Sequence, residues 1–315
     1  MQPWTFVHAA DIHLGSPRSY RHDPARNENW ATAREQMAAM APRFVLIGGD
    51  MTRDGDPHAY ELQLAKDDFE TLPCPCFAVP GNVEVGNKHT PLEREKALDT
   101  QSDKLARFAL YFGPINWTFV FRGVRVTGFY AGVAGSGLPE EEMFWHFMER
   151  LPRLPETRYH VAMMHYALFV NDIHEPAYDP SDRSQYGDWY NGIDEPHRGR
   201  ILGILKAAKT DVVLSGHIHC RRPVEVVDRI RFYRTPSAGG RPQYVDRWPD
   251  GDGTLGFQRL DVAADGIEVT FVPIEPLSSR EPVGPMGHFY TNDHAERGFP
   301  DPEYDHLLPG TRLPR

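Results

Sequence analysis

The sequence is poor in cysteine and contains no long apolar run. Its three cysteines, Cys74, Cys76 and Cys220, are too few and odd in number for a disulfide framework, and we assign them no chemistry. No apolar stretch approaches the roughly 18 residues that a bilayer-spanning helix needs, so we expect no membrane span. The N-terminus also lacks the basic start and the apolar segment of a secretory signal peptide, which predicts a cytoplasmic protein.

Basic residues are also in deficit. The chain has 34 lysines and arginines against 44 acidic residues, a net charge of −10 at pH 7. Because proteins bind the phosphates of nucleic acids largely through clustered Lys and Arg, we expect no stable nucleic-acid binding. Small anions remain suitable ligands, since bound metal ions set the local field whatever the overall charge.

Alternating strand-like and helix-like segments fill the first 85 residues and predict a βαβαβ unit. Apolar runs at 5–10, 43–49 and 75–81 end at Asp11, Asp50 and Asn82, with helix-like segments at 24–41 and 56–72 between them. Parallel sheets built in this way bind ligands beyond the carboxyl ends of their strands. The three polar residues occupy that position.

The sequence after residue 85 predicts further helices and strands on both sides of one long loop. We expect helices at 93–112 and 140–151, a hairpin at 117–131, strands ending at His165 and His217, and four closing antiparallel strands at 223–227, 230–236, 254–262 and 267–274. Residues 166–198 read as a loop, and loops of that length are usually functional or disordered. We assign residues 1–274 to one domain and 275–315 to a Pro- and Gly-rich tail.

Five short strings carry side chains that can bind metal ions. In chain order they are Asp11-Ile12-His13, Gly49-Asp50, Gly81-Asn82, His165 and Gly216-His217-Ile218-His219. Carboxylate oxygen mixed with imidazole nitrogen suits Mn, Fe or Zn better than Ca or Mg. The Asp50 carboxylate has two oxygens with which to bridge two ions, and the neutral amide of Asn82 limits negative charge beside an anionic substrate. The set suffices for two divalent transition-metal ions with positions left for water.

The order of these strings resembles the calcineurin-like metallophosphoesterase superfamily, over roughly residues 5–220 with closing strands to about 274. The resemblance implies an α/β sandwich of two packed mixed β-sheets flanked by helices, with a dinuclear metal site at the strand ends. It places Asp11, His13 and His219 on one ion and Asn82, His165 and His217 on the other. Asp50 would bridge the ions, and Asp50, Asn82 and His217 would be catalytic.

One position departs from the superfamily pattern. The Gly-Asn pair is usually followed by a His that assists the leaving group or contacts the phosphate, and here Val83 follows it, then Glu84. Either the leaving group needs little protonation, or His174 or His197 of the long loop substitutes, or catalysis is reduced. Arg53, Arg221 and Arg222 can in principle meet a phosphate, but we expect them to be solvated.

The sequence therefore predicts a hydrolase that cleaves a small phosphomonoester or phosphodiester by attack of a metal-bound water, without a covalent intermediate. Residues 50–82 are also similar to the cyclic-nucleotide phosphodiesterase branch, which keeps a phosphodiester among the candidate substrates without deciding between the two ester types. One alternative is a catalytically weak or inactive binding module with the same fold, which Val83 supports. The other is a nuclease, which the acidic balance disfavours.

Overall fold

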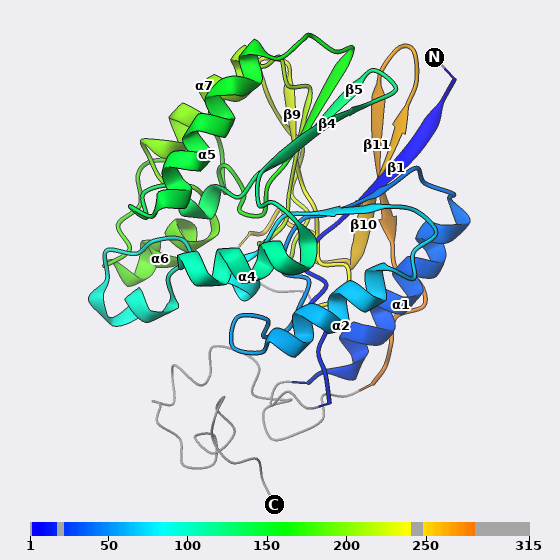
Figure 1. Ribbon diagram of the computed structural model, residues 1–315, viewed down its shortest axis with the longest axis horizontal. Coiled ribbons are helices and arrows are strands. Elements are labelled where there is room, and N and C mark those ends of the chain that lie inside the picture. Colours follow the sequence, from blue (N-terminus) through cyan, green and yellow to red (C-terminus); the bar gives the residue numbers. More distant parts are fainter. Residues whose placement is uncertain (1, 18–21, 241–247, 281–315) are drawn as a thin grey trace, which may run out of the picture.

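Two β-sheets packed face to face form the centre of the molecule in the computed structural model, which describes residues 2–17, 22–240 and 248–280 (Figure 1). The first is a five-stranded sheet in the spatial order β11 (Ile267–Pro273), β10 (Gly256–Val262), β1 (Trp4–Ala9), β2 (Val45–Ile47) and β3 (Cys76–Ala78). β1, β2 and β3 run parallel, and β10 runs antiparallel to β1. The predicted βαβαβ unit is confirmed, with α1 (Pro24–Ala39) and α2 (Ala59–Phe69) as its crossover helices.

The second sheet has six strands and mixed pairing. Its spatial order is β4 (Trp117–Phe121), β5 (Val124–Gly128), β6 (Tyr159–Met163), β7 (Val212–Ser215), β9 (Ile230–Arg234) and β8 (Glu225–Val227). β5, β6, β7 and β9 run parallel, and β4 and β8 are antiparallel edges. The four closing strands therefore divide between the sheets, and the prediction that all are antiparallel is wrong for β9, which pairs parallel with β7.

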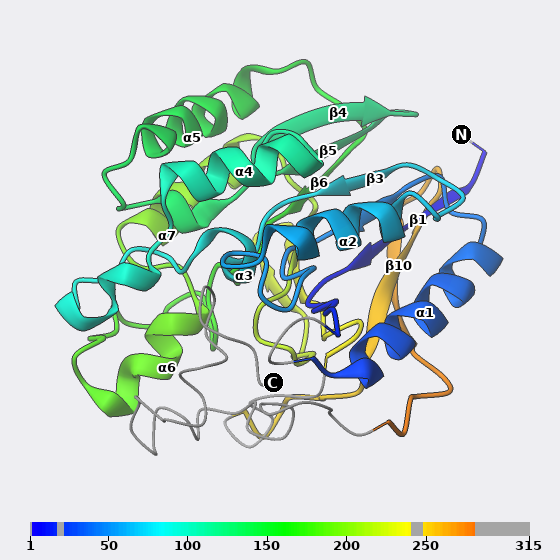
Figure 2. The same ribbon diagram turned by 60° about the horizontal axis from the view of Figure 1, so that its bottom comes forward.

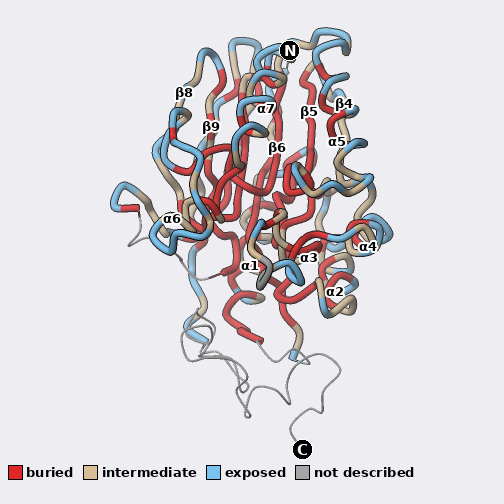
Figure 3. The backbone as a smooth tube through the Cα atoms, turned by 90° about the vertical axis from the view of Figure 1, so that its left-hand side faces the viewer, coloured by how far each residue is buried: buried red, intermediate tan, exposed pale blue. Residues whose placement is uncertain are grey.

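Successive side chains along a strand point to opposite faces of its sheet, so apolar residues pack on both faces. Phe6 and Leu46 of the first sheet pack with Val161 and Leu214 of the second, in an apolar cluster between the sheets. The alternate residues of β1 and β2 face outwards, where α1 and α2 cover them. α5 (Pro139–Arg150) and α7 (His197–Ala207) lie on the outer side of the second sheet (Figures 1 and 2). Figure 3 shows the central strands such as β6 buried, whereas edge strands, helices and connections carry more of the exposed residues.

Two predicted segments differ from the structure. The single helix expected at 93–112 is divided into a 3-10 helix, Glu93–Leu98, and α4 (Ser102–Phe112), because Asp99 between them is extended. The loop expected at 166–198 contains α6 (Arg183–Asn191), and α7 begins inside it at His197. The Asp182 carboxylate accepts a hydrogen bond from the Ser184 backbone amide and so caps α6.

The start of the predicted tail lies against α1. The Ser278 amide donates to the Asn29 side chain at 2.7 Å, and Arg280 forms an ion pair with Glu28. The remainder of the tail, 281–315, lies outside the described residues. Among the described residues, no helix combines the length and the apolar character needed to cross a bilayer.

Candidate metal centre

The seven predicted ligands lie together where the two sheets end. Asp11 and His13 follow β1, Asp50 follows β2 and the α3 turn (Asn82–Val85) follows β3, all at carboxyl ends of parallel strands in the first sheet. In the second sheet His165 follows β6, and His217 and His219 follow β7. Because each sheet supplies part of the set, the site exists only when the sheets are packed against each other.

Unusual backbone angles direct these side chains into the site. Five of them have φ in the left-handed region, at 54° for Asp11, 55° for His13, 48° for Asp50, 70° for His217 and 52° for His219. Each such residue other than Gly costs about 1–3 kcal/mol, and such costs concentrate at functional sites. In both Asp11-Ile12-His13 and His217-Ile218-His219, the two left-handed residues flank a buried Ile, so two polar side chains leave one short turn towards the site.

Close backbone approach explains the glycine before Asn82. A Cβ at Gly81 would lie 2.1 Å from Asp50 Oδ1, which no side chain tolerates. The backbone of Gly81 therefore packs directly against the side chain of Asp50. This contact brings the Asn82 amide next to the carboxylate.

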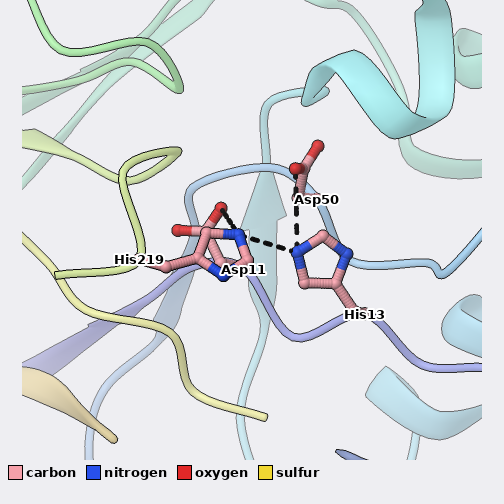
Figure 4. Close-up of side chains that lie close together, drawn as sticks. All are labelled: Asp11, His13, Asp50 and His219. Atoms are coloured by element: carbon pink, nitrogen blue, oxygen red, sulfur yellow. Dashed lines mark hydrogen bonds and ion pairs between the residues drawn. The ribbon is translucent and has the colours of Figure 1, made fainter. Parts of the chain in front are cut away.

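Asp11, His13, Asp50 and His219 form a first buried cluster (Figure 4). His13 Nε2 lies 3.0 Å from His219 Nε2 and 3.8 Å from Asp50 Oδ2. His219 Nε2 lies 3.5 Å from Asp11 Oδ1. The four candidate ligand atoms are within 4.8 Å of one another, a spacing that one cation can span.

A second cluster adjoins the first through Asp50. His165 Nε2 lies 3.4 Å from Asp50 Oδ1, 3.1 Å from His217 Nδ1 and 3.1 Å from Asn82 Oδ1. Asp50 thus turns Oδ2 towards the first cluster and Oδ1 towards the second. This is the arrangement expected of a carboxylate that bridges two ions.

The hydrogen bonds of His165 and His217 show that the second cluster fits a cation. His165 Nδ1 donates to the Gly48 carbonyl at 2.8 Å, and His217 Nε2 donates to the Tyr190 carbonyl at 3.3 Å. Burial lowers the pKa of His165 to about 4 and that of His217 well below its usual value, so both rings are neutral. Their other nitrogens therefore carry no proton, yet they face each other at 3.1 Å. Two lone pairs so placed repel each other unless a positive ion lies between them.

The carboxylates are equally unfavourable without cations. Burial raises the pKa of Asp50 to about 7, and it raises the pKa of Asp11 well above its usual value, with the nearby Asp50 adding to the effect. His13 is neutral, because burial and the neighbouring His219 lower its pKa well below 6.5. Neutral imidazoles beside buried acids form a donor set that suits divalent transition-metal ions.

Glu84 is a buried acid that the sequence reasoning did not assign to the site. Its carboxylate accepts hydrogen bonds from the backbone amides of Asp50 at 3.0 Å, Thr52 at 2.9 Å and Gly81 at 2.8 Å. It therefore joins the turn that carries Asp50 to the turn that carries Asn82. Burial and the charge of Asp50 raise its pKa to about 7. Its position two residues after Asn82 was the available signal.

Neither histidine proposed to replace the motif His reaches the site. The His197 ring stacks on Trp145 of α5 at a centroid distance of 5.8 Å. His174 is exposed, and its described hydrogen bond joins its backbone amide to Asp172. The described contacts therefore give neither suggestion support.

The three arginines also differ from expectation. Arg53 is buried, with 1% of its surface exposed; its charge opposes the burial that raises the pKa of Asp50 and adds to the burial that lowers the pKa of His13. Arg221 and Arg222 form ion pairs with Asp252 and Asp250. The prediction that these side chains are merely solvated is therefore wrong, and for Arg53 most clearly. All three cysteines are free thiols.

Comparison with known proteins assigns the class. The family model for calcineurin-like phosphoesterases matches residues 5–221, so the chain belongs to that family. A curated relative, the uncharacterized metallophosphoesterase YhaO of Bacillus subtilis (strain 168), is 23% identical over 271 residues, which cover 81% of this chain and 60% of YhaO. The chain thus spans about three-fifths of the length of that relative.

Solved structures agree on the fold. Purple acid phosphatase PPD1 from yellow lupin (Lupinus luteus) seeds superposes with a TM-score of 0.60 at 11% identity, covering 88% of this chain and 52% of that one. A dimetal phosphatase from Danio rerio gives 0.51 at 12% identity, covering 86% and 96%. GAP50 of Plasmodium, described as the anchor in the inner membrane complex, gives 0.55 at 13% identity, covering 88% and 86%. Together, the family and the buried Asp and His clusters indicate a phosphoesterase with a dinuclear metal site.

Proposed function

We propose that this protein hydrolyses a small phosphomonoester or phosphodiester with two divalent transition-metal ions, Mn, Fe or Zn. The observation that carries the proposal is the position of Asp50, whose two carboxylate oxygens face two adjoining clusters of buried ligands. Bound there, the ions would lower the pKa of a water molecule, orient the phosphate and neutralise its charge.

The residues divide between the two ions. Asp11, His13 and His219 would hold one ion, and Asn82, His165 and His217 would hold the other. Asp50 would bridge them. Two contacts outside the clusters support the roles of His165 and His217. Each ring uses its outer N–H to donate to a carbonyl, that of Gly48 or that of Tyr190, so its inward-facing nitrogen carries no proton and can bind an ion.

Hydrogen bonds to Asp50 and Glu84 keep the site rigid before substrate binds. Asp50 Oδ1 accepts from the Val83 amide at 3.0 Å, while Glu84 holds the amides of Asp50 and Gly81. Donors and ligands fixed in advance need little rearrangement during the reaction, and this preorganisation is a large part of electrostatic catalysis. We therefore assign Glu84 a positioning role.

Hydrolysis of nitrophenyl esters by manganese-loaded protein tests the proposal. We expect activity on nitrophenyl phosphate or bis-nitrophenyl phosphate, and the ratio of the two rates separates monoesterase from diesterase. Asp50→Asn should lose at least about a hundredfold in rate, because an amide bridges two ions poorly. Asp67→Asn, on the exposed side of α2, is the matched control. Protein that holds both ions but leaves a broad panel of phosphate esters intact would contradict the proposal.

Val83 gives one alternative a specific basis. A chain that binds both ions without hydrolysing any ester would be a binding module, and gain of activity in Val83→His would then locate the defect. A nuclease is the second alternative, and the net charge of −10 weighs against it. Incubation of the same loaded protein with single- and double-stranded DNA tests this second alternative.

A further inference from the structure

The residues around Asn82 are less deeply buried than the rest of the site. Asp11, His165 and His217 are buried, whereas Asn82, Val83 and Tyr190 keep part of their surface exposed. A substrate therefore meets these three residues on its way to the clusters. Val83 stands where the family pattern has a His, and its side chain has no hydrogen-bond donor.

Tyr190, from the end of α6, places a hydroxyl next to that position. Its oxygen lies 3.1 Å from Asn82 Nδ2 and 3.3 Å from Asn87 Oδ1. Its ring lies against His217, with centroids 5.0 Å apart. Asn82 directs its amide oxygen to His165, so the Tyr190 hydroxyl is separated from the second cluster by a single amide group.

Contacts with Lys88 and Tyr186 hold Tyr190 in this position. Lys88 Nζ donates to the Gly192 carbonyl at 2.8 Å and to Asp194 at 2.9 Å, and it lies 4.3 Å from the centre of the Trp189 ring. One turn earlier on α6, the Tyr186 ring stacks on Tyr190 with an interplanar angle of 15°. The segment that carries Tyr190 is thereby tied to the Gly81–Lys88 segment that carries Asn82.

We propose that Tyr190 contacts the substrate and donates a hydrogen bond to the leaving-group oxygen, the role that Val83 is unable to perform. The inference rests on the proposed phosphoesterase function. Water supplies the oxygen that bonds to phosphorus and releases a proton to solvent, and the bond from phosphorus to the leaving oxygen breaks with its electron pair on that oxygen. The leaving oxygen takes its proton from solvent, so Tyr190 stabilises developing charge without losing its own proton. The hydroxyl accepts from Asn82 and donates to Asn87, and its proton would turn from Asn87 to the leaving oxygen when a substrate binds.

A series of leaving groups tests this role. Tyr190→Phe keeps the ring and removes the hydroxyl, and Tyr111→Phe makes the same change on α4, away from the site, as the matched control. In Tyr190→Phe we expect kcat to fall about tenfold or more on phenyl phosphate and less than about twofold on dinitrophenyl phosphate, because a poor leaving group develops more charge on its oxygen. Tyr111→Phe should change neither rate. Adding Val83→His to Tyr190→Phe should restore activity on phenyl phosphate.

Binding measurements separate this role from a structural one. Calorimetry with inorganic phosphate should give about three- to tenfold weaker binding to manganese-loaded Tyr190→Phe than to the wild type, at unchanged metal content. An equal loss of rate on every ester, or no loss on any, in an active wild type would overturn the role of Tyr190 alone. A wild type inert towards all esters would overturn the proposed function together with this inference.

Discussion

At the scale of single residues, the site places charges and lone pairs in positions that are unfavourable unless cations lie between them. The unprotonated nitrogens of His165 and His217 face each other at 3.1 Å, and Asp50 is buried beside Asp11. Bound cations relieve both problems, because they attract the lone pairs and favour the ionised carboxylates. The arrangement is therefore better explained as a set of metal ligands than as a hydrogen-bonded core.

Metal uptake should release protons and strengthen as pH rises through about 7. The pKa of Asp50 is raised to about 7, so the metal-free carboxyl binds a proton below that pH, and an ion must displace it. His165, with its pKa lowered to about 4, holds no such proton near neutral pH. Calorimetry with manganese in two buffers of different ionisation enthalpy should show more protons released at about pH 6 than at about pH 8.5. Equal release at both pH values, or tighter binding at the lower one, would contradict this.

The sequence predicted the seven clustered residues because each lies next to an apolar run and has a side chain that binds metals. It did not predict that Glu84 or Tyr190 belongs to the site. Glu84 acts through backbone amides of turns that are distant in sequence, and Tyr190 arrives from α6. Contacts of this kind depend on tertiary packing, which local patterns do not encode.

At the scale of elements, the segment 166–198 depends on a buried ion pair. The Glu175 carboxylate accepts from Arg198 Nη1 at 2.7 Å and from the backbone amides of Val170 and Asn171. Both charged side chains are almost fully buried. The pair joins Glu175, which precedes α6, to Arg198 in α7. The chain on either side of α6 is thereby tied together.

Arg198→Met should destabilise the protein by about 3–5 kcal/mol, because it leaves the Glu175 carboxylate buried without its partner. Arg200→Met, two residues further along α7, is the matched control, since Arg200 and Glu149 form an exposed pair whose loss should cost less than about 1 kcal/mol. Urea unfolding of the two variants measures the difference. Equal free energies of unfolding would show that the buried pair does not stabilise the segment.

Strands were easier to predict than α6 and the pairing of the closing strands. The sequence of α6, Arg183 to Asn191, contains Gly187, and its aromatic residues at 186, 189 and 190 have helical spacing over little more than one turn, which is too short a pattern to predict a helix. The closing strands were recognised, but their division between sheets rests on pairings such as Phe6 with Leu260 in β10. Such long-range pairing follows from how the whole chain packs.

At the scale of the whole molecule, the two packed sheets are what create the site. Asp11 and Asp50 come from the first sheet, and His165, His217 and His219 come from the second. Asp11 accepts hydrogen bonds from the His217 amide, so the two halves are joined at the site itself. Any ion bound there contacts both sheets and stabilises their packing by mass action.

The metal content of protein saturated with manganese, measured by elemental analysis, tests the central claim most directly. The account predicts about two ions per chain in the wild type, and about one in His13→Ala and in His165→Ala, since each variant weakens one cluster and leaves the other. His146→Ala, on the exposed face of α5, is the control and should keep the wild-type content. A wild type that saturates with one ion or none, or variants that both retain the full content, would contradict the account.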